Sequence, residues 1–190
     1  MIGKGKSISH GVAALEYDLA KEINGQAVAT EIARHELYGC TGAEMVQEMK
    51  PYHIDFPNVK NNCLRFEVSP SIEESATFTD ADWAELGNDF MQRMGLANHQ
   101  YIIIRHSGTE SKKEQAHLHI LANRVSLSGE LYRDNWIGKK ATEAANAIAK
   151  ERNFVQSQDI GKVNKAEIKE AMDGVLKKMQ GFDFTKFKEE

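Results

Sequence analysis

Two neighbouring segments, QYIIIRH and HLHILANRV, constrain the fold of this 190-residue chain more than any other part of its sequence. The first is a β-branched run that ends at His106, and the second alternates histidine with leucine from His117 onward. Because side chains alternate between the two faces of a strand, His117 and His119 share one face and Leu118 lies on the other. The hydrophilic residues 107–116 separate the segments, which predicts an antiparallel β-hairpin with a long loop.

This hairpin would gather three imidazoles. His106 falls opposite His117, and His119 lies two positions further along the second strand. Residues two apart on a strand are separated by about 6.6 Å and opposed residues by about 5 Å, so the three rings can reach one ion. A slip of one residue would send His106 to the other face. A single H-x-H motif is often a packing or surface feature of a strand. The third histidine favours a metal site with open coordination positions.

Periodicity and capping signals predict the elements around the hairpin. Val12, Leu15, Leu19 and Ile23 recur at helical spacing and predict an amphipathic helix, with Tyr17 off its apolar stripe. Glu67, on the polar face of a predicted strand, is a candidate to accept a ring N–H from one of the histidines. The other predicted elements are a helix from Thr41 to Met49, the strand 63–69, a helix at 79–94 with Trp83 in the core, and helices near 137–152 and 165–180.

Composition sets wider limits. The chain is long enough for one domain with its own core. It has no run of eighteen apolar residues and no cleavable signal pattern, so we expect a cytoplasmic protein. Cys40 and Cys63 are predicted to be free thiols. The net charge of −4 argues weakly against a nucleic-acid partner, but the acid is concentrated in residues 31–100, which hold 12 acidic and 5 basic residues.

Three segments together resemble the relaxases, the mobilisation nucleases that nick one DNA strand at the transfer origin of a plasmid or transposon. They are GVAALEYDLAKE, MGLANHQYIIIRH and HLHILANRV, in that order along the chain. The resemblance covers about residues 1–155 and implies an α+β fold with a central antiparallel sheet and flanking helices. It implies a relaxase domain at 1–160, followed by a C-terminal helical extension at 161–190 that we expect to be truncated from a longer protein.

The resemblance also assigns roles to single residues. It implies that Tyr17 is the nucleophile, that His106, His117 and His119 bind a divalent metal ion, and that Asn123 matches the asparagine that follows the H-x-H motif. Family membership suggests Mg²⁺ or Mn²⁺, whereas imidazole ligands favour Zn²⁺, Ni²⁺ or similar ions. The tyrosine would form a covalent 5′-phosphotyrosine bond that keeps the energy of the broken DNA link. Rival nucleophiles are Tyr38, Tyr52, Tyr101 and Tyr132.

The implied partner is single-stranded or locally melted origin DNA, with accessory mobilisation proteins as further partners. Basic residues near the proposed site are candidates for phosphate contacts, which give salt-dependent affinity. These candidates are Lys4, Lys6, Lys112, Lys113 and Arg124. A single strand would also need an exposed aromatic side chain for stacking, which the sequence does not identify.

The chain departs from the family pattern at one position. Relaxases usually carry an aspartate two residues after the first histidine, and Gly108 stands there. Such a carboxylate orients a ligand histidine, and Glu110 or Glu114 are candidates to replace it. A degenerate relative that binds origin DNA or a metal without cutting therefore stays open as an alternative. A phosphodiesterase that activates water with a histidine pair is a weaker one, because it would need two symmetric histidine motifs.

Overall fold

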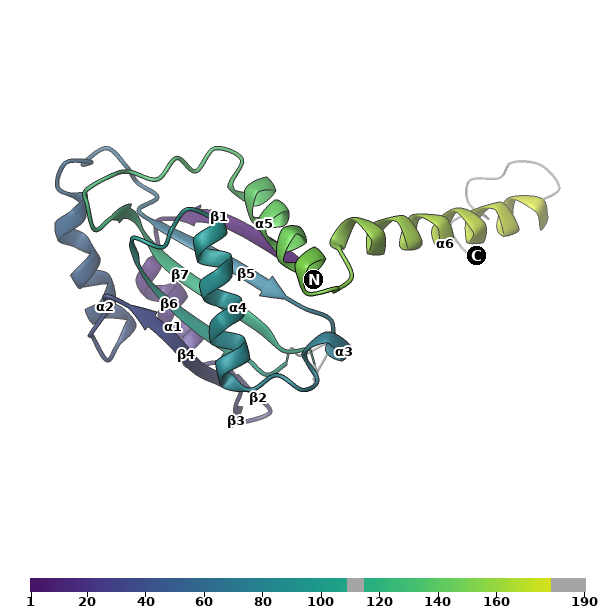
Figure 1. Ribbon diagram of the computed structural model, residues 1–190, viewed down its shortest axis with the longest axis horizontal. Helices are drawn as coiled ribbons and strands as arrows, with labels where there is room; N and C mark the ends of the chain where they lie inside the picture. The colour runs from purple at the N-terminus through teal and green to yellow at the C-terminus, as the bar shows by residue number, and fades with distance from the viewer. Residues whose placement is uncertain (109–114, 179–190) are drawn as a thin grey trace.

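A computed structural model describes residues 1–108 and 115–178 of the chain. Its centre is a five-stranded sheet in which every neighbouring pair is antiparallel (Figure 1). In spatial order the strands are β1 (Ile2–Ile8), β5 (Cys63–Ser69), β7 (His117–Ser126), β6 (His99–His106) and β4 (Ala29–His35). The predicted α+β class with a central antiparallel sheet is confirmed.

Helices cover both faces of the sheet, so its central strands are buried on two sides (Figure 1). Helices α4 (Asp80–Arg93) and α5 (Ile137–Glu151) pack on the face that carries Leu118 and Ile120. Helices α1 (Gly11–Leu19) and α2 (Gly42–Met49) pack on the opposite face, around Leu121. This burial explains the continuous apolar run of β6, because each isoleucine in it meets a core on one face or the other.

The predicted helix starts are confirmed by their hydrogen bonds. The hydroxyl oxygens of Thr41 and Thr79 each accept a hydrogen bond from the backbone N–H of the third helical residue, whose carboxylate accepts one from the backbone N–H of the threonine. Such capping boxes satisfy backbone N–H groups that a helix start would leave unpaired. Helix α2 gives way to a 3₁₀ helix, η1 (Lys50–His53), at Pro51, and α4 ends before Gly95, whose φ is +72°. Trp83 is buried, as predicted.

The predicted apolar stripe of the first helix is partly wrong. Helix α1 ends at Leu19, Val12 is exposed, and the buried positions include Leu15 and Asp18. Ile23 belongs instead to a hairpin of β2 (Glu22–Ile23) and β3 (Gln26–Ala27). Its two-residue turn is Asn24–Gly25, both with positive φ, and the Asn-Gly pair is a strong hairpin signal in the sequence EINGQA.

The two edge strands, β1 and β4, have no counterpart in the sequence prediction. Strand β1 bears glycine at positions 3 and 5, which weakens a strand pattern because glycine has no side chain to pack. Strand β4 is only half-buried and mixes apolar with charged residues. Both strands are therefore recognisable from their pairing with β5 and β6 rather than from their own composition.

Two further helices complete the described chain. Helix α3 (Ile72–Ser75) is a single capped turn, and α6 (Ser157–Lys178) begins earlier than the predicted 165 and leads away from the sheet (Figure 1). Within the described residues, no helix combines the length and apolar character that crossing a membrane requires. Both cysteines are free thiols, and burial raises the pKa of Cys63 to about 11.

The glycines of β1 let helix α5 approach the sheet closely. A Cβ atom at Gly3 would lie 2.4 Å from the backbone oxygen of Ala141 and 2.6 Å from Cβ of Ala145. The hydroxyl of Thr142 donates a hydrogen bond to the Gly3 carbonyl at 3.1 Å. Strand β1 is thus held by backbone pairing with β5 on one edge and by direct backbone contact with α5 on one face.

We expect Gly3→Ala to lower the free energy of unfolding by about 1–3 kcal/mol, because the added methyl group forces α5 away from β1. Urea denaturation followed by circular dichroism measures this loss. Gly174→Ala on α6 is the control, since a Cβ there meets no heavy atom within 4 Å. Equal stability of the Gly3→Ala variant and the unmodified protein would contradict the close approach.

Candidate metal centre

The register of the β6–β7 pair brings the three histidines together. His106 pairs directly with His117, and His119 pairs with Ile104. All three imidazoles therefore project from the same face of the sheet, as the sequence predicts. Their ring centroids lie 5.3 Å apart for His106 and His117, 4.4 Å for His106 and His119, and 4.9 Å for His117 and His119.

The donor atoms of this histidine cluster fit one metal ion. One nitrogen from each ring lies within 4.8 Å of the other two. The Nε2 atoms of His117 and His119 are 3.1 Å apart. Two nitrogens that each bind a tetrahedral Zn²⁺ at ~2.0–2.1 Å are about 3.3 Å apart, which is close to that spacing. The cluster needs only small ring movements to coordinate an ion.

Burial favours the neutral form of His106 and His119, which is the form of imidazole that binds metals. It lowers the pKa of His106 below its ordinary value, although the hydrogen bond to Asp18 opposes this effect. Burial, with the neighbouring imidazoles and Arg65 adding positive charge, lowers the pKa of His119 to about 2. Since a protonated imidazole has no free lone pair, these shifts preserve the donors at neutral pH.

Backbone carbonyls determine which nitrogen of two rings is available. Nδ1 of His117 lies 3.1 Å from the Gln115 carbonyl oxygen, and Nε2 of His106 lies 2.7 Å from the Asp18 carbonyl oxygen. A carbonyl only accepts, so each of these ring nitrogens donates its proton. In the neutral rings, Nε2 of His117 and Nδ1 of His106 keep their lone pairs for an ion.

A buried ion pair supports the third ring. Asp18, on α1, is 1% exposed and receives hydrogen bonds on both carboxylate oxygens from Arg65 of β5. Arg65 also lies 3.3 Å from Nδ1 of His119, and the Asp18 carboxylate lies 3.8 Å from the same nitrogen. Burial raises the pKa of the Asp18 carboxyl, and the Arg65 hydrogen bonds oppose that rise. A guanidinium has only donors, so Nδ1 of His119 accepts from Arg65, and Asp18 acts on this ring through Arg65.

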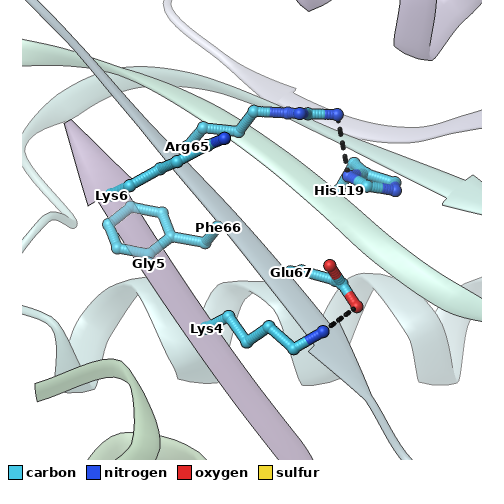
Figure 2. Close-up of a pocket in the computed structure, with 7 residues that line it drawn as sticks. All are labelled: Lys4, Gly5, Lys6, Arg65, Phe66, Glu67 and His119. Atoms are coloured by element: carbon cyan, nitrogen blue, oxygen red, sulfur yellow. Dashed lines mark hydrogen bonds and ion pairs between the residues drawn. The ribbon is translucent and has the colours of Figure 1, made fainter. Parts of the chain in front are cut away.

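A cavity of about 200 Å³ opens beside His119. Its walls include Lys4 and Lys6 of β1 and Arg65 of β5 (Figure 2). Lys4 pairs with Glu67 at 3.0 Å, and that pair is exposed to solvent. The basic side chains make the cavity suitable for an anion such as a phosphate group next to the histidine cluster.

The family of the chain follows from its sequence match. A family model described as "Relaxase: MobA/VirD2-like, nuclease domain" matches residues 17–154. The chain belongs to the relaxases. No curated protein matches it. Among solved structures, it is similar to the metal-bound complex of the conjugative relaxase TrwC with oriT DNA, at 12% identity and a TM-score of 0.48. That match covers 84% of this chain and 70% of the other.

The relaxase places Tyr17 at the surface of α1, directly before Asp18. Its side chain is 55% exposed, and its hydroxyl oxygen lies 2.6 Å from Nζ of Lys21. The Lys21 ammonium also lies 4.8 Å from the centre of the Tyr17 ring. The phenol is therefore accessible to a substrate and is not part of the apolar core.

Glu67, a predicted supporting residue, contacts a lysine and not a histidine. Glu67 lies opposite His119 in the sheet, but its carboxylate pairs with Lys4 and not with an imidazole. The carboxylate linked to His119 is instead that of Asp18, which acts through Arg65. Lys112 and Lys113, and the loop candidates Glu110 and Glu114, lie outside the described residues.

Asn123 is buried in the fold of this relaxase. It is fully buried, four residues beyond His119, and its side-chain oxygen accepts hydrogen bonds from His53 and from the backbone of Val125. Its amide donates to Gln100. These bonds connect β7 to η1 and β6, so Asn123 is a buried part of the fold and not a solvated strand end.

Arg124 also serves the fold in the structure. Its guanidinium donates to the backbone oxygens of Tyr132 and Asn61 and pairs with Asp134 at 2.6 Å. These contacts use three of the five N–H donors of the guanidinium, and the DNA contact of Arg124 stays a prediction. Among the proposed DNA contacts within the described residues, the structure brings only Lys4 and Lys6 to the cavity beside the histidine cluster.

The sequence prediction missed Asp18, Arg65 and Lys21. The sequence carries a signal for Arg65, because it lies two positions before Glu67 and therefore on the same polar face of β5. Asp18 had a weaker signal, since a charged residue next to Tyr17 on a helix is ordinarily solvated. Its burial depends on the packing of α1 against the sheet, which local sequence does not reveal.

We expect the relaxase to bind one Mn²⁺ or Zn²⁺ ion per chain, and His119→Ala to weaken binding by more than about 100-fold. Loss of a ligand should exceed the effect of losing an outer hydrogen-bond partner. Isothermal titration calorimetry measures the affinity. His10→Ala is the control, because His10 is exposed and lies outside the cluster. Unchanged binding by the His119→Ala variant would contradict the site.

Asp18→Asn should weaken metal binding about 10- to 100-fold, because the carboxylate no longer supports the imidazole of His119. The matched control is Glu67→Gln, which removes the carboxylate that the sequence favoured and should leave the affinity unchanged. Thermal unfolding of both variants separates a change in metal affinity from a loss of fold. An equal loss of affinity in both variants would show that Asp18 has no special role.

Proposed function

We propose that this relaxase nicks one DNA strand by transesterification, with the Tyr17 hydroxyl as nucleophile. The phenol oxygen bonds to the scissile phosphorus, and the bond from phosphorus to the 3′ oxygen breaks. The phenol loses its proton, the 3′ oxygen takes one up, and the 5′ phosphate stays on the tyrosine. Because the phosphotyrosine is a diester, the strand can be rejoined later. The observation that carries this proposal is the position of Asp18, the residue after Tyr17. Its carbonyl oxygen accepts a hydrogen bond from His106, and its carboxylate accepts one from Arg65 beside His119.

His106, His117 and His119 would hold the metal ion. When bound, a divalent cation there would withdraw charge from the non-bridging oxygens of the scissile phosphate. Mg²⁺ and Mn²⁺ are the ions that the family suggests, and the all-imidazole donor set also suits Zn²⁺ or Ni²⁺. The convergence of the three imidazoles supports binding of an ion at this place, and the backbone carbonyls of Asp18 and Gln115 hold the rings of His106 and His117.

Lys21 supports the choice of Tyr17. Its ammonium donates to the phenol oxygen at 2.6 Å, so a positive charge faces the oxygen that becomes negative as it attacks. The rival tyrosines lack such a donor or are less accessible. Tyr101 is 7% exposed and donates to Asn88, and the hydrogen bond to Glu36 raises the pKa of Tyr38. Burial likewise raises the pKa of Tyr132.

The proposed substrate is single-stranded or locally melted DNA at a transfer origin, for conjugative mobilisation. Lys4, Lys6 and Arg65 beside His119 would contact its phosphates. Accessory mobilisation proteins and a cytoplasmic location belong to the same proposal. Binding of origin DNA without cleavage is the competing function, and the buried Asp18 carboxylate weighs against it because it lies beside His119 although Gly108 stands at the usual aspartate position.

We also propose a nuclease domain at residues 1–160 and an extension at 161–190. Helix α6 crosses this boundary and leads away from the sheet (Figure 1). The family match ends at residue 154, before the proposed extension. The predicted truncation concerns the final residues, and those from 179 onward lie outside the described part of the chain.

Tyr17→Phe should abolish covalent attachment to DNA, because it removes the attacking oxygen and leaves the ring in place. The protein is incubated with Mn²⁺ and a random-sequence pool of labelled single strands, and attachment is scored as label that survives denaturing electrophoresis. Tyr38→Phe is the control and should form as much adduct as the unmodified protein. Retention of the label by the Tyr17→Phe variant would place the nucleophile elsewhere. Native binding without any adduct in the unmodified protein would favour the competing function.

A further inference from the structure

Trp136 carries two energetic costs that the fold does not explain. Its side chain is 80% exposed, whereas the second tryptophan, Trp83, is buried. Its backbone is left-handed, with φ 58° and ψ 28°, a conformation that disfavours bulky side chains. A non-glycine residue is held in this region only at an energetic cost to the fold. Strain of this kind is concentrated at functional sites, so a role for the indole outside the fold is the natural explanation.

The surroundings of Trp136 are basic. A hollow of about 280 Å³ is lined by Trp136, Lys139, Lys140 and Glu143. Lys140 is fixed in place, since its ammonium donates to the Arg133 carbonyl at 2.8 Å and lies 4.9 Å from the Tyr132 ring. Lys139 is 71% exposed, and its ammonium lies 3.8 Å from the Glu143 carboxylate in a solvent-exposed ion pair. An exposed aromatic face beside two ammonium groups suits a nucleotide, with its flat base and its phosphate.

The position of Trp136 relates it to the histidine cluster. Helix α5 runs along β1 in the opposite direction, since Ala145 and Ala141 lie against Gly3, and Ala141 and Gly138 lie near Gly5. Trp136 precedes Gly138 and therefore lies beyond Gly5, toward the end of β1 that carries Lys6.

The sheet register gives the distance from His119 to Lys4 on the edge strand, across which a DNA strand would pass. Lys4 pairs with Glu67, and Glu67 pairs with His119, so these residues form one row across three strands. Two spacings of about 4.8 Å place Lys4 roughly 10 Å from His119, which a single strand spans with a few nucleotides. Lys4 and Lys6 project from the face that carries His119, whereas Gly3 and Gly5 contact α5 on the other face. Strand β1 is the edge of the sheet, so a DNA strand would pass around this edge to reach Trp136.

We propose that Trp136, with Lys139 and Lys140, forms a second subsite for single-stranded DNA, where the indole stacks on a base of the strand that leaves the histidine cluster across β1. This inference rests on the proposed function, because it extends the same DNA path. An unpaired base is the fitting ligand, since duplex DNA hides the faces of its bases within the stack. Stacking would be tolerant of sequence, because every base has such a face.

The test measures equilibrium binding without metal, by fluorescence anisotropy of a labelled random-sequence single strand of about 20 nucleotides. Trp136→Leu should weaken binding about 5- to 100-fold, the effect of losing one stacked base. Trp136→Phe keeps an aromatic face and should restore most of the affinity. Tyr38→Leu is the matched control, because Tyr38 is 76% exposed but lies beside Glu36 and Glu48.

Two further measurements separate stacking from a general change. A strand of the same length made of abasic units should bind the unmodified protein and the Trp136→Leu variant equally. Single-stranded DNA should quench the fluorescence of Trp136, and the loss of that signal in Trp136→Phe identifies it because Trp83 is buried. Equal affinity of the Trp136→Leu variant and the unmodified protein for the normal strand would overturn the proposal. The covalent adduct with Tyr17 is scored separately, so failure of cleavage leaves this result readable.

Discussion

The pairing of His106 with His117 is the constraint on which the rest of the site depends. Strand β6 alone does not define it, because its three successive isoleucines would remain apolar after a slip of one residue. Strand β7 does define it, because the same slip would turn His117 and His119 toward α4 and α5 and bury two imidazoles in an apolar core. The cost of misplacing the histidines therefore helps to select the register that brings them together.

How much of the fold was predictable from sequence depended on whether an element carries its own local signal. Helices α2 and α4 have capping residues and β7 has clear alternation, so each was recognised. Strands β1 and β4 take their conformation from neighbouring strands, and half-buried edges tolerate glycine and charged residues. The β2–β3 hairpin is different, because its Asn-Gly turn was a local signal that a helical interpretation of Ile23 obscured.

The candidate site shows the same division. The three histidines lie on two consecutive strands, so their convergence follows from one hairpin and from the period of a strand. The groups around them come from distant segments, and a carboxylate on the correct face does not reveal its partner. Glu67 lines the cavity beside His119 but pairs with Lys4, and Arg124 pairs with Asp134, so neither contacts an imidazole. Asp18 reaches it because α1 packs across β5, β6 and β7.

The contacts of Asp18 have a mechanical consequence. Its carbonyl accepts a hydrogen bond from His106 of β6 and its carboxylate accepts one from Arg65 of β5, so the C-terminal end of α1 is hydrogen-bonded to two strands of the sheet. The helix backbone that carries the neighbouring Tyr17 phenol is therefore fixed relative to the sheet. Under the proposed function, a phosphodiester would therefore be aligned with Tyr17 by bending of the nucleic acid, which an unpaired strand accommodates more readily than a stiff double helix.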